Sequence, residues 1–175
     1  MGVNLEEISK YIGTRLDLLL GADILLKYRV LLDLPNNLIQ FSLPDRPGRG
    51  SHVALRMLAG VPIAACLANG KEIQAVFDTG SQFCYVHKSL IQGQVSIGKE
   101  KDFYPGLGEF ETDMYQVPFN IGGNAVNLRC GVLPAMLESA LGVTGAHGIL
   151  GVELMQKFSI WLNLHDREMI LRKVA

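Results

Sequence analysis

Residues 73–81 read Ile-Gln-Ala-Val-Phe-Asp-Thr-Gly-Ser, an apolar run that leads directly into a carboxylate. The run favours a buried strand and the residues after it favour a turn, so Asp78 is expected where the strand ends. Gly80 permits a tight turn, while Thr79 and Ser81 bring hydroxyl groups beside the acid. A carboxylate delivered by a buried strand is a candidate for acid–base chemistry. The alternative is a surface β-turn without a catalytic role, because Asp, Thr, Gly and Ser are ordinary turn residues.

The composition describes a globular chain with enough apolar material for a packed core. Of its 175 residues, 49% are hydrophobic and 19% are charged, which excludes intrinsic disorder as the default state. The 16 Lys and Arg residues form no cluster and are balanced by 17 Asp and Glu, so nucleic acid is not expected as a partner. The longest apolar stretch, residues 57–69, is shorter than the roughly 20 residues of a membrane-spanning helix. We therefore expect no membrane partner either.

The cysteines and the first residues bear on the cellular compartment. Cys66, Cys84 and Cys130 lie in apolar sequence, and their odd number favours buried free thiols over a disulfide framework. The first residues contain no basic segment followed by an apolar run, so a secretory signal is not expected. Both observations predict a cytoplasmic protein.

Short apolar runs separated by Gly, Pro and Asn dominate the chain from residue 53 onward. Strands are expected over residues 53–58, 63–67, 73–77, 115–121 and 126–132, with turns at Asn69-Gly70 and Gly122-Gly123-Asn124. Short helices are expected over Leu5–Tyr11 and Pro134–Leu141.

One stretch has the character of a linker. Residues 43–51 contain two prolines and two glycines, which remove backbone donors and loosen the chain. We therefore divide the chain into an N-terminal arm (1–43), a linker (44–52) and a mostly β body (53–175).

The arm repeats the end of the body. Residues 19–30, Leu-Leu-Gly-Ala-Asp-Ile-Leu-Leu-Lys-Tyr-Arg-Val, align without a gap with residues 149–160, Ile-Leu-Gly-Val-Glu-Leu-Met-Gln-Lys-Phe-Ser-Ile, at a constant offset of 130. Each copy predicts a short helix and then two strands around a polar turn, at 35–37 and at 165–167. Chance similarity between amphipathic segments is the alternative. The repeat suggests that the arm is the tail of a preceding copy of the body that is absent here.

Two motifs together resemble the retropepsin-like aspartic proteases of the retroviral-protease clan. Residues 78–81 match the first signature of that family, and Ile149-Leu150-Gly151 followed by a helical stretch matches the second, in the right order. Between them the family carries a glycine-containing flap, for which residues 103–110 are the candidate. The resemblance covers roughly residues 53–172 and implies an all-β, closed-barrel acid-protease lobe with one or two short helices.

The resemblance implies an aspartic endopeptidase that hydrolyses peptide bonds through a water activated by two Asp carboxylates. Two close carboxylates cannot both ionise cheaply, so they share a proton and titrate as a pair. By this analogy Asp78 is the catalytic acid and base. Thr79 bonds across a dimer, Gly80 leaves room for the carboxylate, and Ser81 donates a hydrogen bond to it.

The remaining site residues are also carried over from the family. Ile149, Leu150 and Gly151 are expected to support the Asp-Thr-Gly loop from beneath. The flap candidates are Tyr104, Gly106, Leu107 and Gly108, which close over the substrate. The resemblance implies neither a metal nor an organic cofactor.

The chain contains one Asp-Thr-Gly sequence, whereas a dyad needs two. We therefore expect a homodimer in which each subunit contributes Asp78, with a peptide or protein as substrate. One alternative is a non-catalytic retropepsin-fold module for dimerisation or peptide binding. Another is one lobe of a two-lobed protease, in which the other lobe supplies the second Asp.

Cysteine and histidine offer two further alternatives. Cys84 and His87 have the spacing of half a zinc site, but a structural site needs four ligands. A Cys84 nucleophile paired with His87 or His147 is compatible with the sequence, because such partners meet only in space. Nothing adjacent to Cys84 activates its thiol, so we expect neither site.

Overall fold

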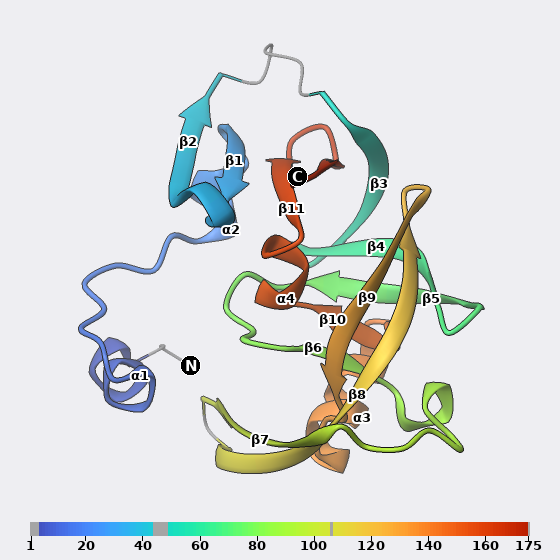
Figure 1. The fold of residues 1–175 in the computed structure, drawn as a ribbon. Coiled ribbons are helices and arrows are strands. Elements are labelled where there is room, and N and C mark those ends of the chain that lie inside the picture. The colour runs from blue at the N-terminus through green and yellow to red at the C-terminus, as the bar shows by residue number, and fades with distance from the viewer. Residues whose placement is uncertain (1–3, 44–48, 106, 175) are drawn as a thin grey trace.

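The computed structural model describes residues 4–43, 49–105 and 107–174, whose arrangement is drawn in Figure 1. The strands are β1 (Arg29–Asp33), β2 (Leu38–Ser42), β3 (Ser51–Leu58), β4 (Val61–Ala68), β5 (Lys71–Phe77), β6 (Cys84–Val86), β7 (Gly98–Tyr104), β8 (Gly108–Ile121), β9 (Asn124–Gly131), β10 (Gly148–Leu150), β11 (Phe158–Asn163) and β12 (Glu168–Lys173). The α-helices are α1 (Leu5–Ile12), α2 (Ala22–Leu25), α3 (Ala135–Val143) and α4 (Val152–Met155), and the 3₁₀ turns are η1 (Leu34–Asn36) and η2 (Lys88–Leu90).

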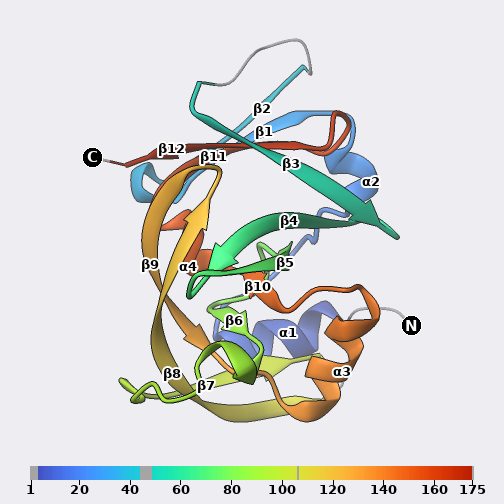
Figure 2. The same cartoon turned by 90° about the vertical axis from the view of Figure 1, so that its right-hand side faces the viewer.

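The strands form a 12-stranded sheet in the order β2-β1-β11-β12-β3-β4-β5-β10-β6-β9-β8-β7. An additional pairing of β4 with β8 joins the run from β4 to β8 into a closed ring of paired strands. In Figure 2, β11 and β12 lie above this ring together with β1 and β2 of the arm. The predicted mostly β architecture with a few short helices is confirmed.

Most of the expected elements are present. The five expected strands correspond to β3, β4, β5, β8 and β9, and the two expected helices to α1 and α3. The Asn69-Gly70 turn has positive φ at both residues, as a two-residue hairpin turn requires. β3 begins at Ser51, inside the stretch expected to be a linker, because Ser51 and His52 pair with β12.

Three strands were not predicted from the sequence. β6 and β10 contain three residues each, which is too short for periodicity to show. β7 is largely charged and lies on the exposed flap hairpin, where no apolar face has to be buried. β8 extends from Gly108 rather than from residue 115, because its first half pairs with β7.

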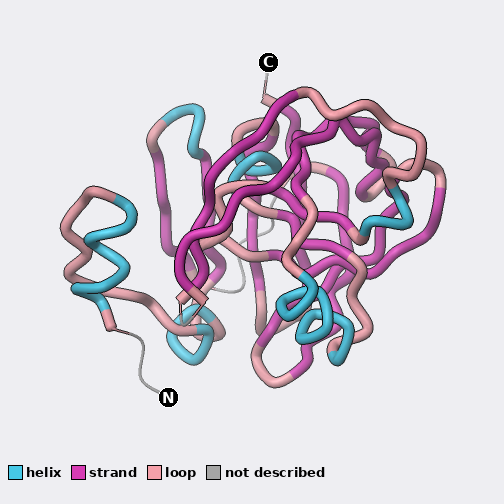
Figure 3. The backbone as a smooth tube through the Cα atoms, turned by 90° about the horizontal axis from the view of Figure 1, so that it is seen from below, coloured by secondary structure: helices cyan, strands magenta, loops and turns pink. Residues whose placement is uncertain are grey.

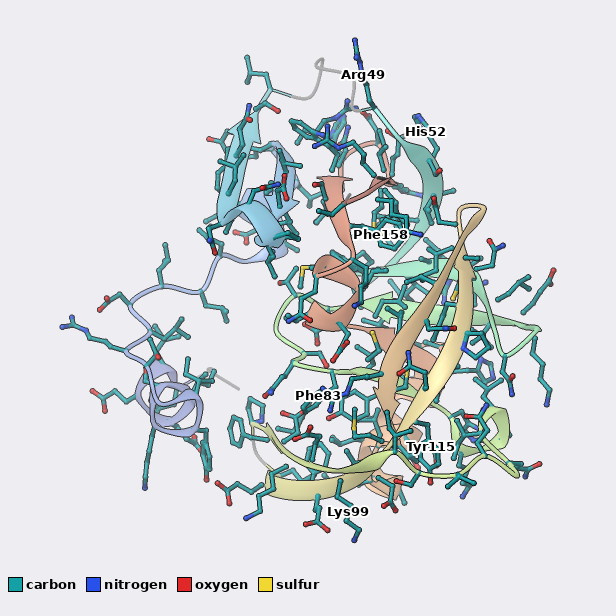
Figure 4. The ribbon with its side chains drawn as sticks, in the orientation of Figure 1. Arg49, His52, Phe83, Lys99, Tyr115 and Phe158 are labelled. Atoms are coloured by element: carbon teal, nitrogen blue, oxygen red, sulfur yellow. The ribbon has the colours of Figure 1, made fainter. Side chains whose placement is uncertain are left out.

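One large apolar core connects most elements of the body. Phe158, Leu154 and Met169 are fully buried in it, together with side chains of β3, β4, β5 and β9. Phe158 points into this core from the start of β11 (Figure 4). The helix α4 and the hairpin β11–β12 therefore close the core of the body from one side.

The arm joins the same sheet through one strand. β1 pairs antiparallel with β11, and β2 pairs with β1 to form the outer edge. α1 lies at one side of the molecule and joins no strand pairing (Figures 1 and 3). The Tyr11 ring of α1 stacks on Phe103 of β7 with 3.8 Å between ring centroids. The arm thus contacts the body at β11 and at the flap.

Candidate active site

The Asp-Thr-Gly loop begins where β5 ends at Phe77. β10 runs parallel to β5 with Leu150 opposite Phe77, so the second motif lies directly beside the first. The backbone N–H of Asp78 donates to the Leu150 carbonyl at 3.0 Å. This pairing holds the Asp78 backbone at the end of the buried strand, while its side chain is exposed.

The loop itself is a tight turn around the carboxylate. The Gly80 N–H donates to Asp78 Oδ1 at 2.8 Å. A Cβ at Gly80 would lie 3.3 Å from the same oxygen, which agrees with the expectation that glycine leaves room for the acid. The Ser81 hydroxyl donates to the Phe83 carbonyl at 2.9 Å, so the expected hydrogen bond from Ser81 to the carboxylate is wrong. The Gly80 N–H donates to the carboxylate instead, because it lies nearer in the turn. The hydrogen bond of the exposed Thr79 across a dimer stays a prediction.

Gly151 fits tightly beneath this loop. A Cβ there would lie 2.2 Å from the Phe83 carbonyl oxygen and 2.5 Å from that of Ser81. The next residue, Val152, donates its N–H to the Ser81 carbonyl at 2.9 Å. Ile149 and Leu150 pack in the layers on either side of β10. The three residues expected to support the loop therefore lie in contact with its elements.

The flap is the hairpin of β7 and β8. Tyr104 and Leu107 are exposed at its end, the Leu107 N–H donates to the Tyr104 carbonyl at 3.0 Å, and Gly108 has a φ of 88°. Gly106, the fourth flap candidate, lies outside the described residues. The hairpin expected from the sequence is present, with Tyr104, Leu107 and Gly108 at its end.

A hydrogen bond that the sequence did not predict connects the flap to β6, the strand that follows the Asp-Thr-Gly loop. The Tyr85 hydroxyl of β6 donates to the Asp102 carboxylate of β7. Burial, and then the hydrogen bond to Asp102, raise the pKa of Tyr85, so this phenol stays protonated. Tyr85 and Asp102 form no recognisable sequence motif, because they meet only when β6 and the flap are folded together.

The flap base is also tied to the loop through charge. Arg129 of β9 forms ion pairs with Glu100 of β7 and with Glu153 of α4, the latter at 3.5 Å. The Arg129 guanidinium lies 5.7 Å from the centre of the Phe83 ring. Phe83 occupies the interior between the flap and β6 in Figure 4, and Lys99 lies on the outer side of the flap. The base of the flap and the end of the loop therefore share one network.

Solved structures with a similar fold were found by comparison, although no family model matches the chain and no curated protein matches its sequence. A retropepsin-like aspartic protease from Rickettsia conorii superposes with a TM-score of 0.51 at 18% identity, over 71% of this chain and 96% of that one. The chain has the retropepsin-like fold. The protease of simian foamy virus (mac) superposes with a TM-score of 0.40 at 16% identity, over 53% of this chain and 90% of that one. The foamy viral protease–reverse transcriptase gives 0.42 at 14% identity, over 54% of this chain and 12% of that one.

In this retropepsin-like lobe the cysteines belong to the core. Cys66, Cys84 and Cys130 are buried and free. Burial raises the pKa of the Cys66 thiol to about 12 and also raises that of Cys130. Cys84 is fully buried and accepts a hydrogen bond from the Gly151 N–H at 3.4 Å. These thiols are placed for packing, which argues against a Cys84 nucleophile.

The residues that the structure describes form no cluster of three or more His, Cys, Asp or Glu suited to a metal ion. Over the same residues, no helix has the length and apolar character needed to cross a membrane.

A cavity of about 300 Å³ lies between β6 and α3 of the retropepsin-like lobe. Its lining includes His87, Glu138 and His147, and His87 Nε2 lies 3.4 Å from Glu138 Oε1. Asp78 does not line this cavity. The cavity is therefore separate from the Asp-Thr-Gly loop.

Proposed function

We propose that the chain contributes one catalytic lobe to an aspartic endopeptidase, with Asp78 as one carboxylate of the dyad. The observation that carries the proposal is the Asp78 loop. Its backbone is anchored to Leu150 at 3.0 Å, its Oδ1 accepts from the Gly80 N–H, and its side chain faces solvent. This arrangement supports a rigidly placed carboxylate that a substrate can reach.

The proposed chemistry needs a second carboxylate facing Asp78. One carboxylate is ionised and takes a proton from water, while the other donates the shared proton to the carbonyl oxygen of the peptide. The water oxygen bonds to the carbonyl carbon, giving a tetrahedral diol. The C–N bond then breaks as a proton moves to the nitrogen, releasing a carboxyl and an amine. The flap end, with Tyr104 and Leu107, covers the substrate and excludes water.

The second carboxylate comes from outside this lobe, because the chain holds one Asp-Thr-Gly sequence. A homodimer with one Asp78 from each subunit is the arrangement predicted from the sequence. A two-lobed arrangement supplies the same group from a different lobe. The cytoplasmic location is part of this proposal as well, and it rests on the free buried thiols.

The test measures cleavage of a mixed peptide library between about pH 4 and pH 7 over a range of protein concentrations. Asp78→Asn removes the proposed catalytic charge, and Glu72→Gln removes one exposed charge at the other end of β5 as a matched control. We expect cleavage that Asp78→Asn abolishes and Glu72→Gln retains. Cleavage that survives Asp78→Asn would overturn the proposal.

A non-catalytic binding module is the second candidate. It is favoured by one observation, namely that β1 of the same chain already occupies the edge of β11. If neither the folded chain nor the two-lobed fusion described below cleaves any peptide of the library, the module replaces the peptidase as the assigned function.

A further inference from the structure

The structural repeat is longer than the sequence repeat. At the offset of 130, α1 matches α3, α2 matches α4, β1 matches β11, and β2 matches β12. Local bonds match as well. The Ser9 hydroxyl donates to the Leu5 carbonyl at 2.7 Å, and that of Ser139 donates to the Ala135 carbonyl at 2.8 Å. The arm therefore contains counterparts of the C-terminal elements of a lobe, from α3 onward, except that residues 18–20, which are equivalent to β10, form no strand.

The arm and the body are paired symmetrically. Leu31 lies opposite Trp161 in the β1–β11 register, and these two residues are equivalent in the repeat. Val30 lies opposite Leu162, and Leu32 lies opposite Ile160. Because Val30 is equivalent to Ile160 and Leu32 to Leu162, replacing each residue by its equivalent turns the first pair into the second. Such a register is that of two equivalent strands related by a local twofold axis at Leu31 and Trp161. The arm thus stands where the terminal hairpin of a second lobe would stand.

The arm exposes side chains whose counterparts in the body are buried. We call this set the arm face; it comprises Leu20, Ile24, Tyr28, Ile39 and Phe41, with exposed fractions of 36–60%. Their counterparts, Leu150, Leu154, Phe158, Met169 and Leu171, have exposed fractions of 0–1% and belong to the main core. The arm face is therefore one half of a lobe core, and its apolar side chains lack the layer that covers them in the body.

The body shows what covers such a face. Leu150, Phe158 and Met169 pack in one cluster with side chains of β3, β4, β5, β6, β8 and β9. The outer edge of β12 pairs with β3, where Met169 lies opposite Val53. Among the described residues, no strand pairs with the outer edge of β2, the equivalent of β12. A strand equivalent to β3 fits that open edge.

We propose that the arm face binds the N-terminal part of a second retropepsin-like lobe, formed by strands equivalent to β3–β9. The arm supplies the helices and the terminal hairpin of that lobe. A second copy of this chain is not the occupant, because its own β3–β9 are already covered by its own α4, β11 and β12. The catalytic consequence rests on the proposed function: the second lobe brings the second Asp-Thr-Gly loop. The binding itself does not depend on it.

The experiment completes the arm with the chain's own strands. In a two-lobed fusion, a second copy of residues 51–131 replaces Met1, so that Gly131 of the added copy is joined to Gly2. This junction keeps the offset of the repeat. Phe41→Ala is then compared in the full chain and in the fusion by equilibrium unfolding in urea. Leu171→Ala, at the equivalent position of the body, is the matched control.

We expect Phe41→Ala to change the unfolding equilibrium constant less than about threefold in the full chain, where the side chain is exposed. In the fusion we expect a loss of at least about 30-fold, as for a core residue. Leu171→Ala is expected to cost at least about 30-fold in both proteins. If Phe41→Ala unfolds either protein outright, Ile39→Ala replaces it. Equal effects of Phe41→Ala in both proteins, or an added copy that stays unfolded by circular dichroism, would overturn the proposal.

Two further outcomes separate the proposals. If the full chain dimerises in sedimentation equilibrium and Phe41→Ala abolishes the dimer, a second copy is the occupant and this inference is overturned. If Phe41→Ala destabilises the fusion more than the full chain but the fusion cleaves no peptide, the proposed function is contradicted and the binding stands. If cleavage depends on Asp78 but Phe41→Ala has the same effect in both proteins, the binding is contradicted and the function stands.

Discussion

Replacing Gly151 by alanine tests whether the second motif supports the Asp-Thr-Gly loop. The added Cβ would lie 2.2 Å from the Phe83 carbonyl oxygen and 2.5 Å from that of Ser81. Both oxygens belong to the backbone, so no side-chain rotation relieves the contact. The loop has to move by about 1 Å to reach an ordinary contact distance, which is a large shift in a close-packed interior.

The cost follows from what that movement breaks. Overpacking a well-filled site costs about 1–3 kcal/mol. The same shift lengthens the bond from the Val152 N–H to the Ser81 carbonyl, now 2.9 Å, and each lost buried hydrogen bond costs about 1–2 kcal/mol. We therefore expect Gly151→Ala to lower the free energy of unfolding by about 2–5 kcal/mol, and to displace the Asp78 loop in whatever molecules remain folded.

The assay is urea unfolding followed by the fluorescence of Trp161, the single tryptophan of the chain. Gly142→Ala is the control, because a Cβ there meets nothing within 4 Å and the residue lies in α3. We expect that control to be neutral or stabilising by up to about 1 kcal/mol, since alanine favours helix over glycine. A loss below about 1 kcal/mol for Gly151→Ala would refute the reasoning that the loop rests rigidly on this residue.

Three shorter predictions concern the flap and the core. The buried Thr112 hydroxyl donates to the Val132 carbonyl and accepts from its N–H, both at 2.9 Å. Thr112→Val leaves the N–H and the carbonyl of the partly buried Val132 without this partner and is expected to cost about 1–3 kcal/mol in urea unfolding; an effect under about 0.5 kcal/mol would show that water replaces the hydroxyl. Tyr85→Phe removes the donor to Asp102 and is expected to cost about 1–3 kcal/mol and to speed amide exchange in β7; unchanged exchange would contradict the role of this bond as an anchor of the flap. Burial raises the pKa of Cys66 from 9.0 to about 12, so the thiol's contribution to stability is complete below pH 9 and is lost as the pH rises toward 12. The urea midpoint should therefore fall above pH 9, and fall less steeply in Cys66→Ala; identical slopes would show that other groups cause the decline.

The sequence predicted the parts of the fold that depend on local pattern. The apolar run before Asp78 forms β5, as its own pattern indicates. The Asn69-Gly70 turn has the expected backbone. These features need only neighbouring residues to be specified.

The sequence did not predict contacts that depend on tertiary packing. The partner of the Ser81 hydroxyl is set by which oxygen lies nearest in the folded turn, and composition cannot distinguish Phe83 from Asp78. The Tyr85–Asp102 bond requires β6 and the flap to be folded together first. The match of α1 with α3 escaped detection because the two helices share little beyond one serine and their spacing from a glycine.

The pairing of β1 with β11 bears directly on the source of the second carboxylate. A homodimer that pairs β11 with β11 of another copy must first remove β1, and with it the buried side chains of Val30 and Leu31. Exposing both costs about 3–6 kcal/mol in each chain, before any backbone hydrogen bond is counted. A second lobe that binds the arm face leaves β1 in place and covers apolar side chains that are now exposed. A homodimer built through β11 would therefore compete with the arm of its own chain, whereas the proposed two-lobed arrangement would leave that arm in place.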